Sequence, residues 1–261
     1  MLKHMNRFGK LSVICASMIM LGACQPKSDA ETKKSNETAA QAKQSESWYI
    51  ESKNIELKPK QKQVCDEAGC TEYSFQTVET NHPWINTYFK NRIEKADPIP
   101  FQSATKSSET KTVDPLKLSQ SQTVVRYLSQ HQNIASFEYL SYVYPAGAAH
   151  GMYHKEYVHF DLKTKKRIAL QDLIVKGQNK KLLETLYSAN SMWLTDHNIE
   201  QDKLELSDNF YYGVDGIVFV YPLYELASYA EGMSELTLPY VSVNGLIQSE
   251  YLPNLPKLTA E

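Results

Sequence analysis

The sequence lacks a long apolar run after its first 23 residues, an excess of positive charge and an abundance of cysteine. A membrane-spanning helix needs roughly 20 apolar residues in succession, and no later stretch supplies them. The chain has 28 basic and 30 acidic side chains, and three of the basic ones lie in the first 23 residues. Residues 24–261 therefore carry 25 basic and 30 acidic groups, a net charge of about −5. This balance argues against nucleic acid as a partner and against a polybasic contact with anionic lipid.

The first 23 residues have the organisation of an export signal. Three basic residues precede an apolar run at 11–21, and no acidic residue occurs before Cys24. The run is too short for a comfortable membrane span and has the length of a secretory h-region. It ends in Leu21-Gly22-Ala23-Cys24, which resembles the lipobox of bacterial lipoproteins. We therefore expect residues 1–23 to be a cleaved signal peptide and Cys24 to carry the lipid.

Attachment to the membrane would then rest on the lipid alone. One acyl chain binds a membrane only marginally, so stable anchoring needs the several chains that lipoprotein cysteines carry. Gln25 follows the cysteine, at a position where aspartate would resemble an inner-membrane retention signal. We expect a cell-envelope location, at the periplasmic face of the outer membrane in a host that has one. The alternative is an ordinary secreted protein with an accidental cysteine.

Cys65 and Cys70 remain once Cys15 leaves with the signal and Cys24 is acylated. An oxidising compartment favours a disulfide between them. The residues between them are turn-formers, and residues 71–78 alternate as a strand does, so the pair predicts a disulfide across a β-hairpin. The alternative is half of a zinc site, which would need two further ligands nearby, and the only close histidine is His82.

Sequence patterns divide the rest of the chain. Residues 24–47 are rich in Lys, Glu, Ser, Gln and Ala without large apolar side chains, which predicts a disordered tether. An N-terminal module is expected at 48–121, a second module at 122–250 and a tail at 251–261.

The periodicity of apolar residues predicts an α+β fold, with a few helices packed on antiparallel sheets. One amphipathic helix is expected from Pro83 to the stop at Asp97-Pro98, and another over 182–193. Strands are expected at 48–57, 62–78, 123–144 with a turn at 131–133, 153–162, 167–170, 210–212, 217–221 and 236–240.

Two motifs in the second module resemble those of the RsiV-like family of extracytoplasmic domains. Residues 141–151, Ser-Tyr-Val-Tyr-Pro-Ala-Gly-Ala-Ala-His-Gly, are similar to the family's Tyr-Thr-Gly-Gly-Ala-His signature, with Pro145-Ala146 replacing the first Thr-Gly. Residues 224–232, Tyr-Glu-Leu-Ala-Ser-Tyr-Ala-Glu-Gly, are similar to its second motif, with Ser228 where the family usually has proline. Leu238-Pro239-Tyr240 resembles its closing Ile-Pro-Tyr.

The resemblance covers about residues 122–250, and the first module more weakly resembles the domain that precedes it in such proteins and in PdaC-type deacetylases. It implies little chemistry, since most members have no known activity. The best-known member is an anti-sigma factor whose outer domain binds lysozyme. We expect no anti-sigma role, because that needs a cytoplasmic segment and a transmembrane helix. Deacetylation is not expected either, because no paired-aspartate metal motif occurs.

Three histidines offer the strongest argument for a metal. His150 and His154 are four apart, which on a helix would place both on one face. This stretch is instead expected to be a loop followed by a strand, in which His154 shares a face with Val158 and His159 points the other way. We expect no metal and no cofactor, and we expect His150 to bond backbone groups beside Gly147 and Gly151.

Glu225 and Glu231 are candidates for the paired carboxylates of glycoside hydrolysis, which lie roughly 5 to 10 Å apart. The simpler interpretation is a structured turn, in which Tyr224 and Tyr229 are anchors and Glu225 accepts backbone hydrogen bonds. No catalytic residue is therefore assigned.

Tyrosine is abundant, with 17 residues, and its flat apolar body with one polar tip suits interfaces and sugar stacking. Strands also favour aromatic residues for their own packing. We expect a lipid-anchored binding protein, with lysozyme-type muramidases or an envelope glycan as partner. The alternatives are an enzyme acting on peptidoglycan or another envelope polysaccharide, and a structural lipoprotein. The candidate binding residues are Tyr142, Tyr144, Gly147, His150, Tyr224, Glu225 and Tyr229.

Overall fold

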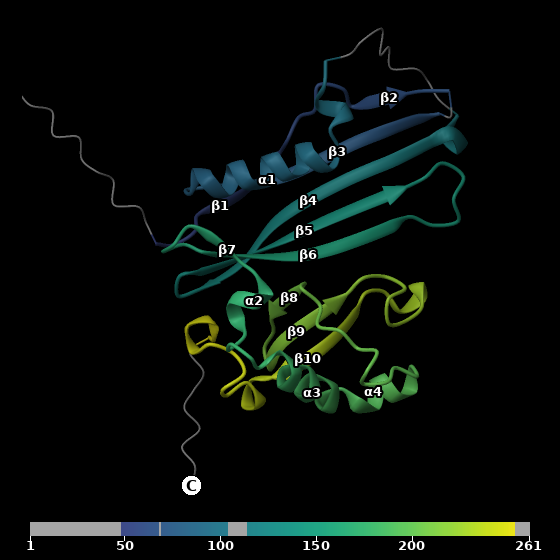
Figure 1. Ribbon diagram of the computed structural model, residues 1–261. Coiled ribbons are helices and arrows are strands. Elements are labelled where there is room, and N and C mark those ends of the chain that lie inside the picture. Colours follow the sequence, from purple (N-terminus) through teal and green to yellow (C-terminus); the bar gives the residue numbers. More distant parts are fainter. Residues whose placement is uncertain (1–47, 68, 104–113, 254–261) are drawn as a thin grey trace, which may run out of the picture. The chain divides into compact units, whose positions relative to one another are not determined.

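The computed structural model describes residues 48–67, 69–103 and 114–253. They belong to one compact unit, Ser45–Glu261, which contains a large sheet, a small sheet and four α-helices in the described part (Figure 1). The expected signal peptide, Cys24 and the tether lie outside the described residues, as does the tail after residue 253. Among the described residues, no helix is long and apolar enough to cross a membrane.

The large sheet has the strand order β1-β3-β4-β5-β6-β7, and β2 also pairs with β3. Its strands are β1 Ser52–Glu56, β2 Gln63–Cys65, β3 Cys70–Thr80, β4 Leu118–His131, β5 Ile134–Tyr144, β6 Met152–Asp161 and β7 Lys166–Ile168. All neighbours are antiparallel except β3 and β4, which are parallel from Cys70↔Leu118 to Gln76↔Val124. The boundary expected near residue 120 thus falls inside β4, and this parallel pairing joins both expected modules in one sheet.

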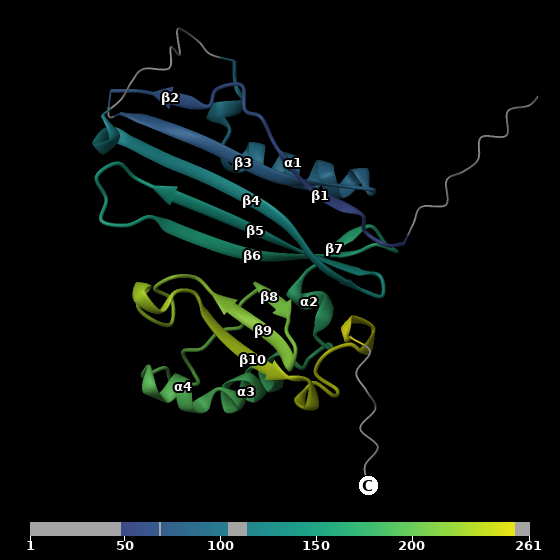
Figure 2. The ribbon, with the colours of Figure 1, turned by 180° about the vertical axis from the view of Figure 1, so that it is seen from behind.

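The helix α1, Pro83–Ala96, provides the crossover between the parallel strands and covers one face of the large sheet (Figure 2). Proline at its first turn costs no hydrogen bond. The helix ends at Ala96, because the next residue, Asp97, precedes Pro98 and such a residue disfavours helical geometry. Its buried face consists of Ile85, Phe89 and Ile93. Phe89 packs 5.2 Å from the ring of Phe137 on β5, and the predicted helix is confirmed.

The two faces of β5 differ because side chains alternate along a strand. Ala135, Phe137 and Tyr139 belong to the core that also contains the buried residues of α1. Ser136, Glu138, Leu140 and Tyr142 alternate with them and face the side opposite α1. That opposite face is more polar and remains partly exposed.

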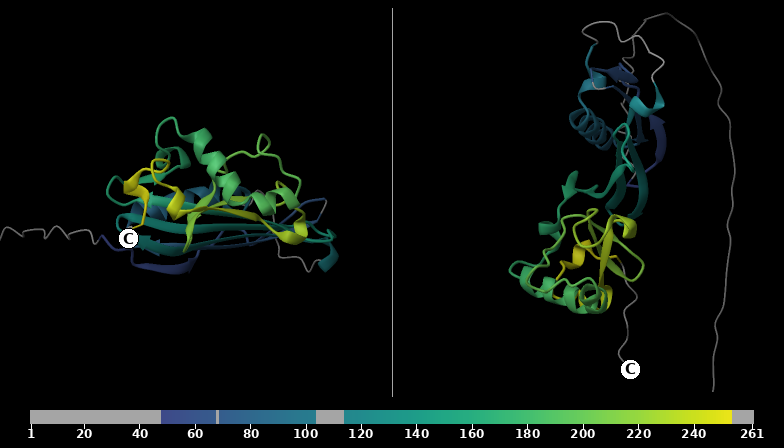
Figure 3. Two further views of the ribbon diagram at one scale, coloured as in Figure 1. Left: turned by 90° about the horizontal axis from the view of Figure 1, so that it is seen from below. Right: turned by 90° about the vertical axis from the view of Figure 1, so that its right-hand side faces the viewer.

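The small sheet has the order β10-β9-β8, with β8 Phe210–Tyr212, β9 Gly216–Tyr221 and β10 Ser234–Pro239. Three helices lie on the same side of the unit as the small sheet (Figure 3): α2 Leu170–Leu173, α3 Asn179–Ala189 and α4 Ser191–Asp196. Leu182, Leu186 and Leu194 from α3 and α4 share a core with Phe219 and Leu236 of the sheet. The short 3-10 helices are η1 Ile99–Phe101, η2 Pro115–Lys117, η3 Tyr229–Glu231, η4 Tyr240–Ser242 and η5 Ser249–Tyr251.

The prediction of a single helix over 182–193 is wrong, because the helix is interrupted at Asn190, which lies between α3 and α4. The amide of Asn190 donates to the carbonyl of Thr237 at 2.9 Å and accepts from its N–H at 3.1 Å. Asn190 thus supplies hydrogen-bond partners for the backbone of Thr237 at the outer edge of β10, where no further strand pairs within the described chain. A buried polar backbone group without a partner costs free energy, so this contact outweighs continuation of the helix.

The Cys65–Cys70 disulfide is present, and the two cysteines are also paired in the register of β2 and β3. The described residues contain no group of three or more His, Cys, Asp and Glu side chains arranged to hold a metal ion. The hairpins expected at 131–133, between β6 and β7 and between β8 and β9 are confirmed.

Candidate binding surface

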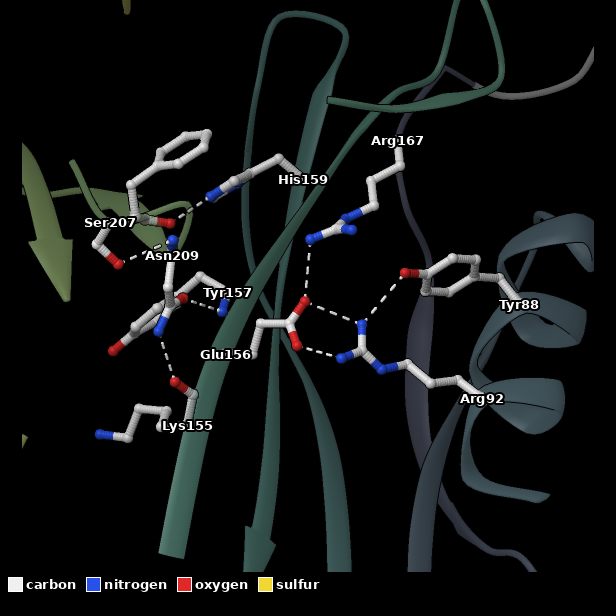
Figure 4. A network of polar contacts seen from close by, with 10 residues as sticks. Tyr88, Arg92, Lys155, Glu156, Tyr157, His159, Arg167, Ser207 and Asn209 are labelled. Carbon is white, nitrogen blue, oxygen red and sulfur yellow. Dashed lines mark hydrogen bonds and ion pairs between the residues drawn. The ribbon is translucent and has the colours of Figure 1, made fainter. Parts of the chain in front are cut away.

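The outer edge of β6 is covered by side chains rather than by another strand, because β7 pairs only with residues 159–161 of β6. Asn209 donates to the carbonyl of Lys155 at 2.7 Å and accepts from the N–H of Tyr157 at 2.8 Å (Figure 4). Met233 Sδ accepts from the N–H of Lys155 at 3.3 Å. Ser207 in turn accepts from the N–H of Asn209. The small sheet and the segment after η3 therefore dock on an edge that would otherwise expose its backbone.

The same edge brings the two sequence motifs together. The hydroxyl of Tyr229 donates to the carbonyl of Gly151 at 2.8 Å. The ring of His150 stacks on the ring of Tyr229, with 3.9 Å between centroids and 23° between planes. Tyr224 follows, with its ring 5.7 Å from that of Tyr229. We call residues 145–151 and 224–232 the motif cluster.

Two glycines of the motif cluster allow close packing of tyrosine. A side chain at Gly151 would overlap the ring of Tyr142 on β5. A Cβ at Gly232, where φ is +81°, would lie 2.9 Å from the hydroxyl of Tyr153 on β6. Gly147 has φ +74°, and a Cβ there would meet nothing within 4 Å, so its backbone conformation alone favours glycine.

Tyrosines extend from the motif cluster over the face of the large sheet opposite α1. Tyr142 and Tyr153 are directly paired across β5 and β6, and Tyr157 lies 4.6 Å from the ring of Tyr211 on β8. Tyr142, Tyr153 and Tyr157 are half-buried, and their hydroxyls make no hydrogen bond within the described residues. The tyrosine surface, as we define it, consists of Tyr142, Tyr144, Tyr153, Tyr157, Tyr224 and Tyr229.

The surroundings of Tyr157 and the neighbouring Tyr211 favour the protonated form of both phenols. Burial and the nearby carboxylates of Glu235 and Glu138 raise the pKa of Tyr157. Burial and a hydrogen bond with Glu235 raise the pKa of Tyr211 to about 12. Tyr144 is fixed differently, since its hydroxyl donates to the carbonyl of Ala148 at 2.8 Å and so shapes the first motif loop. At neutral pH, Tyr157 and the neighbouring Tyr211 therefore present neutral hydroxyl groups.

The three histidines weighed as metal ligands lie in three different environments. His159 is buried, with Nδ1 2.9 Å from Ser136 Oγ and Nε2 2.7 Å from the carbonyl of Phe210. His154 is exposed and shares the strand parity of Val158, while His150 belongs to the stack on Tyr229. His150 Nδ1 also lies 3.1 Å from the carbonyl of Gly151, which agrees with the expected backbone contact.

The two candidate carboxylates also have separate partners. Glu231 pairs with His197 Nε2 at 2.7 Å and accepts from Ser228 Oγ at 3.0 Å. Burial and the charge of Glu205 raise the pKa of Glu225. The backbone hydrogen bonds expected at the Glu225 carboxylate do not occur among the described residues, because Glu231 is the carboxylate that binds within this turn. Sequence reasoning missed His197, the partner of Glu231, and Asn209 at the edge of β6. Neither has a local sequence signal, because each binds a residue far away in the sequence.

The geometry defines an α+β protein with a partly exposed tyrosine surface at which two motif loops meet. Residues 163–241 match the model of the DUF3298 family, which is described as a protein of unknown function. No curated protein matches the chain. The second motif lies inside this domain and the first motif precedes it.

Two solved structures share the fold. One is a DUF3298 family protein from Pseudomonas aeruginosa PAO1, with a TM-score of 0.61 and 19% identity, covering 79% of this chain and 98% of that one. The other is a member of the same family from Bacteroides fragilis NCTC 9343, with a TM-score of 0.52 and 15% identity, covering 77% of this chain and 94% of that one. These likenesses concern the fold alone.

Proposed function

We propose that this chain is a binding protein of the cell envelope and that the tyrosine surface contacts its partner. The observation that carries the proposal is the convergence of the motif loops, through the Tyr229–Gly151 hydrogen bond and the His150–Tyr229 stack, beside the exposed Tyr224 and several half-buried tyrosines. Tyrosine combines a large apolar area with few rotatable bonds, which is why it is enriched at interfaces. The proposed partner class is a lysozyme-type muramidase, as the resemblance to RsiV-like domains suggests.

An envelope glycan is the alternative ligand for the same surface. Sugar rings stack on exposed aromatic rings, and their hydroxyls would match the free hydroxyls of Tyr142, Tyr153 and Tyr157. Catalysis on such a glycan has less support. Glu225 and Glu231 do not share a partner, and the three histidines of the sequence analysis lie in three different environments. Binding is therefore the function that we put forward.

The first test mixes residues 45–261 with a C-type lysozyme and measures binding by calorimetry. Tyr224 is 56% exposed, and Tyr224→Ala is expected to weaken binding by about tenfold or more, as loss of a central aromatic anchor does. Tyr49→Ala is the matched control, because Tyr49 is 76% exposed and lies outside the tyrosine surface. Equal losses in both variants would contradict the assignment of the surface. Absence of lysozyme binding together with binding of peptidoglycan fragments would select the glycan, and absence of both would refute the proposal.

We further propose that Cys24 carries the lipid that holds this protein at the envelope. Growth with an alkyne-labelled fatty acid should label the full chain, and Cys24→Ala should abolish the label and release the protein from the membrane fraction. The physical reason is that residues 24–261 have no other membrane-binding feature in their sequence. Cys15→Ala, which alters the signal segment without touching the lipobox, should keep the label. Labelling of the Cys24→Ala variant would contradict this assignment.

A further inference from the structure

His197 links the second motif to the helix α4. It follows the last residue of α4 and its Nε2 lies 2.7 Å from Oε2 of Glu231 in η3. Its Nδ1 lies 2.8 Å from the carbonyl oxygen of Trp193. Both partners are acceptors only, whereas a neutral imidazole has one donor and one acceptor nitrogen. The doubly protonated ring alone can make both hydrogen bonds.

We propose that His197 and Glu231 form a pH-controlled clasp that holds the second motif loop in its binding conformation. The inference rests on the proposed function, because it concerns regulation of the same surface. Glu231 lies two residues after Tyr229 and closes the turn through Ser228. Loss of the clasp therefore frees the segment that places Tyr224 and Tyr229 beside Gly151.

Few other charged groups face the clasp. Asp196 precedes His197 and favours its protonated form, and Ser228 Oγ donates to the second oxygen of Glu231. From the other motif loop, His150 lies against Tyr229 but is bound to neither member of the pair. The Glu231 side chain is 47% exposed and that of His197 is 22% exposed, so protons reach both groups from solvent.

The pH window follows from the directions of the two pKa shifts. The hydrogen bond with Glu231 raises the pKa of His197 above its ordinary value of 6.5, and the hydrogen bond with His197 lowers the pKa of Glu231 below its ordinary 4.5. The clasp is complete below pH 6.5 and loses its ion pair as pH rises through the raised pKa of His197, because the neutral ring has only one donor for its two acceptors. Acid opens it only below the ordinary range of glutamate.

The stacked indole of Trp193 supplies a local probe. Its ring lies 3.9 Å from the ring of His197, with 23° between planes. A protonated imidazole in contact with an indole quenches its fluorescence, so release of the proton should brighten Trp193. This signal needs no partner protein.

The test uses residues 45–261, their His197→Gln variant and a His154→Gln control that removes an exposed histidine from β6. Hydrogen exchange is compared at pH 6 and pH 8.5, corrected for intrinsic rates. We expect the amides of Glu231 and Gly232, which bond Ser228 and Tyr229, to lose about fivefold or more of their protection at pH 8.5. His197→Gln should show low protection and constant fluorescence at both values, while His154→Gln should behave as the parent chain.

Equal protection at both pH values in the parent chain would overturn the clasp. The same would follow from an unchanged pH response in His197→Gln. Lysozyme affinity is then measured at both pH values, and the clasp predicts tighter binding at pH 6 in the parent chain only. A clasp seen by exchange without lysozyme binding would refute the proposed partner and leave the clasp standing, so the two failures are distinguishable.

Discussion

Glu156→Gln is expected to lower the free energy of unfolding by roughly 3 kcal/mol, because it removes the only carboxylate between two guanidinium groups in the described part of this network. Arg92 of α1 binds Glu156 through both of its terminal nitrogens, and Arg167 of β7 binds the same carboxylate at 3.0 Å (Figure 4). The Glu156 side chain is 15% exposed and that of Arg92 is 29% exposed. Glutamine keeps the size of the side chain and removes the charge.

The large effect arises from what remains after the substitution. Arg92 is held in place by the ring of Tyr139, 4.5 Å away, and by the hydroxyl of Tyr88. It cannot turn freely to solvent, so a partly buried cation is left beside Arg167. Removing one partner of a buried ion pair costs more than the pair itself contributes.

The measurement is urea unfolding of residues 45–261 followed by circular dichroism. Glu94→Gln is the matched control, because Glu94 pairs with Lys90 at 3.9 Å on the surface of α1, the helix that carries Arg92. Such exposed pairs contribute about 0.5 kcal/mol or less. A Glu156→Gln variant as stable as Glu94→Gln would show that the network carries no net stability. At roughly 2–4 °C per kcal/mol for a domain of this size, the expected loss is also visible in the melting temperature.

Local signals account for the elements that the sequence predicted correctly. The turn residues between Cys65 and Cys70 and at 131–133 act within a few positions, so hairpins could be read from them. The apolar spacing of Ile85, Phe89 and Ile93 similarly defines one face of α1. Each of these predictions needs only information from neighbouring residues.

Contacts between distant segments could not be derived in this way. Asn209 and Asn190 cover the edges of β6 and β10 across separations of 47 to 54 residues. No sequence feature near either asparagine indicates which strand it contacts. Asn190 also interrupts a helix whose apolar pattern continues to Trp193. The parallel pairing of β3 with β4 likewise depends on the path of the whole chain.

The motifs of the candidate surface illustrate the same limit. The resemblance singled out His150, Tyr224 and Tyr229, but the contact between Tyr229 and Gly151 joins residues 78 positions apart. The sequence offers Glu231 only as a catalytic carboxylate, because its partner His197 follows the end of α4 and lies outside the motif. A motif can thus mark a surface before the topology reveals which side chains hold it together.

Because of His159, the free energy of unfolding is expected to fall by roughly 3 kcal/mol as the pH is lowered from 6.5 to 4. Burial lowers the pKa of His159 to about 4, whereas the unfolded chain has the ordinary value near 6.5. Between these values the unfolded chain binds one more proton than the folded chain, so stability falls as pH falls, by about 1.4 kcal/mol per pH unit. The contribution is fully present above pH 6.5.

The contacts of His159 explain why the folded state resists protonation. The neutral ring donates from Nε2 to the carbonyl of Phe210 and accepts at Nδ1 from the hydroxyl of Ser136. It also stacks on the ring of Phe210, 4.7 Å away. A second proton would have to replace the accepted hydrogen bond in a site that is closed to water. Burial lowers the pKa of the neighbouring His131 as well, and it acts in the same direction.

Urea unfolding of residues 45–261 at several pH values between 4.5 and 7.5 tests this, with His159→Gln as the comparison. The glutamine amide can still donate to the carbonyl of Phe210 but does not titrate, so its stability should depend less steeply on pH, by about one proton below pH 6.5. His154→Gln removes a histidine that is exposed on β6 and should leave the slope unchanged. Because carboxylates lose stability in the same range in all three chains, the difference between slopes isolates His159. Parallel curves for the parent chain and His159→Gln would mean that His159 is protonated in the folded state, and that the ring donates to Phe210 and Ser136 together.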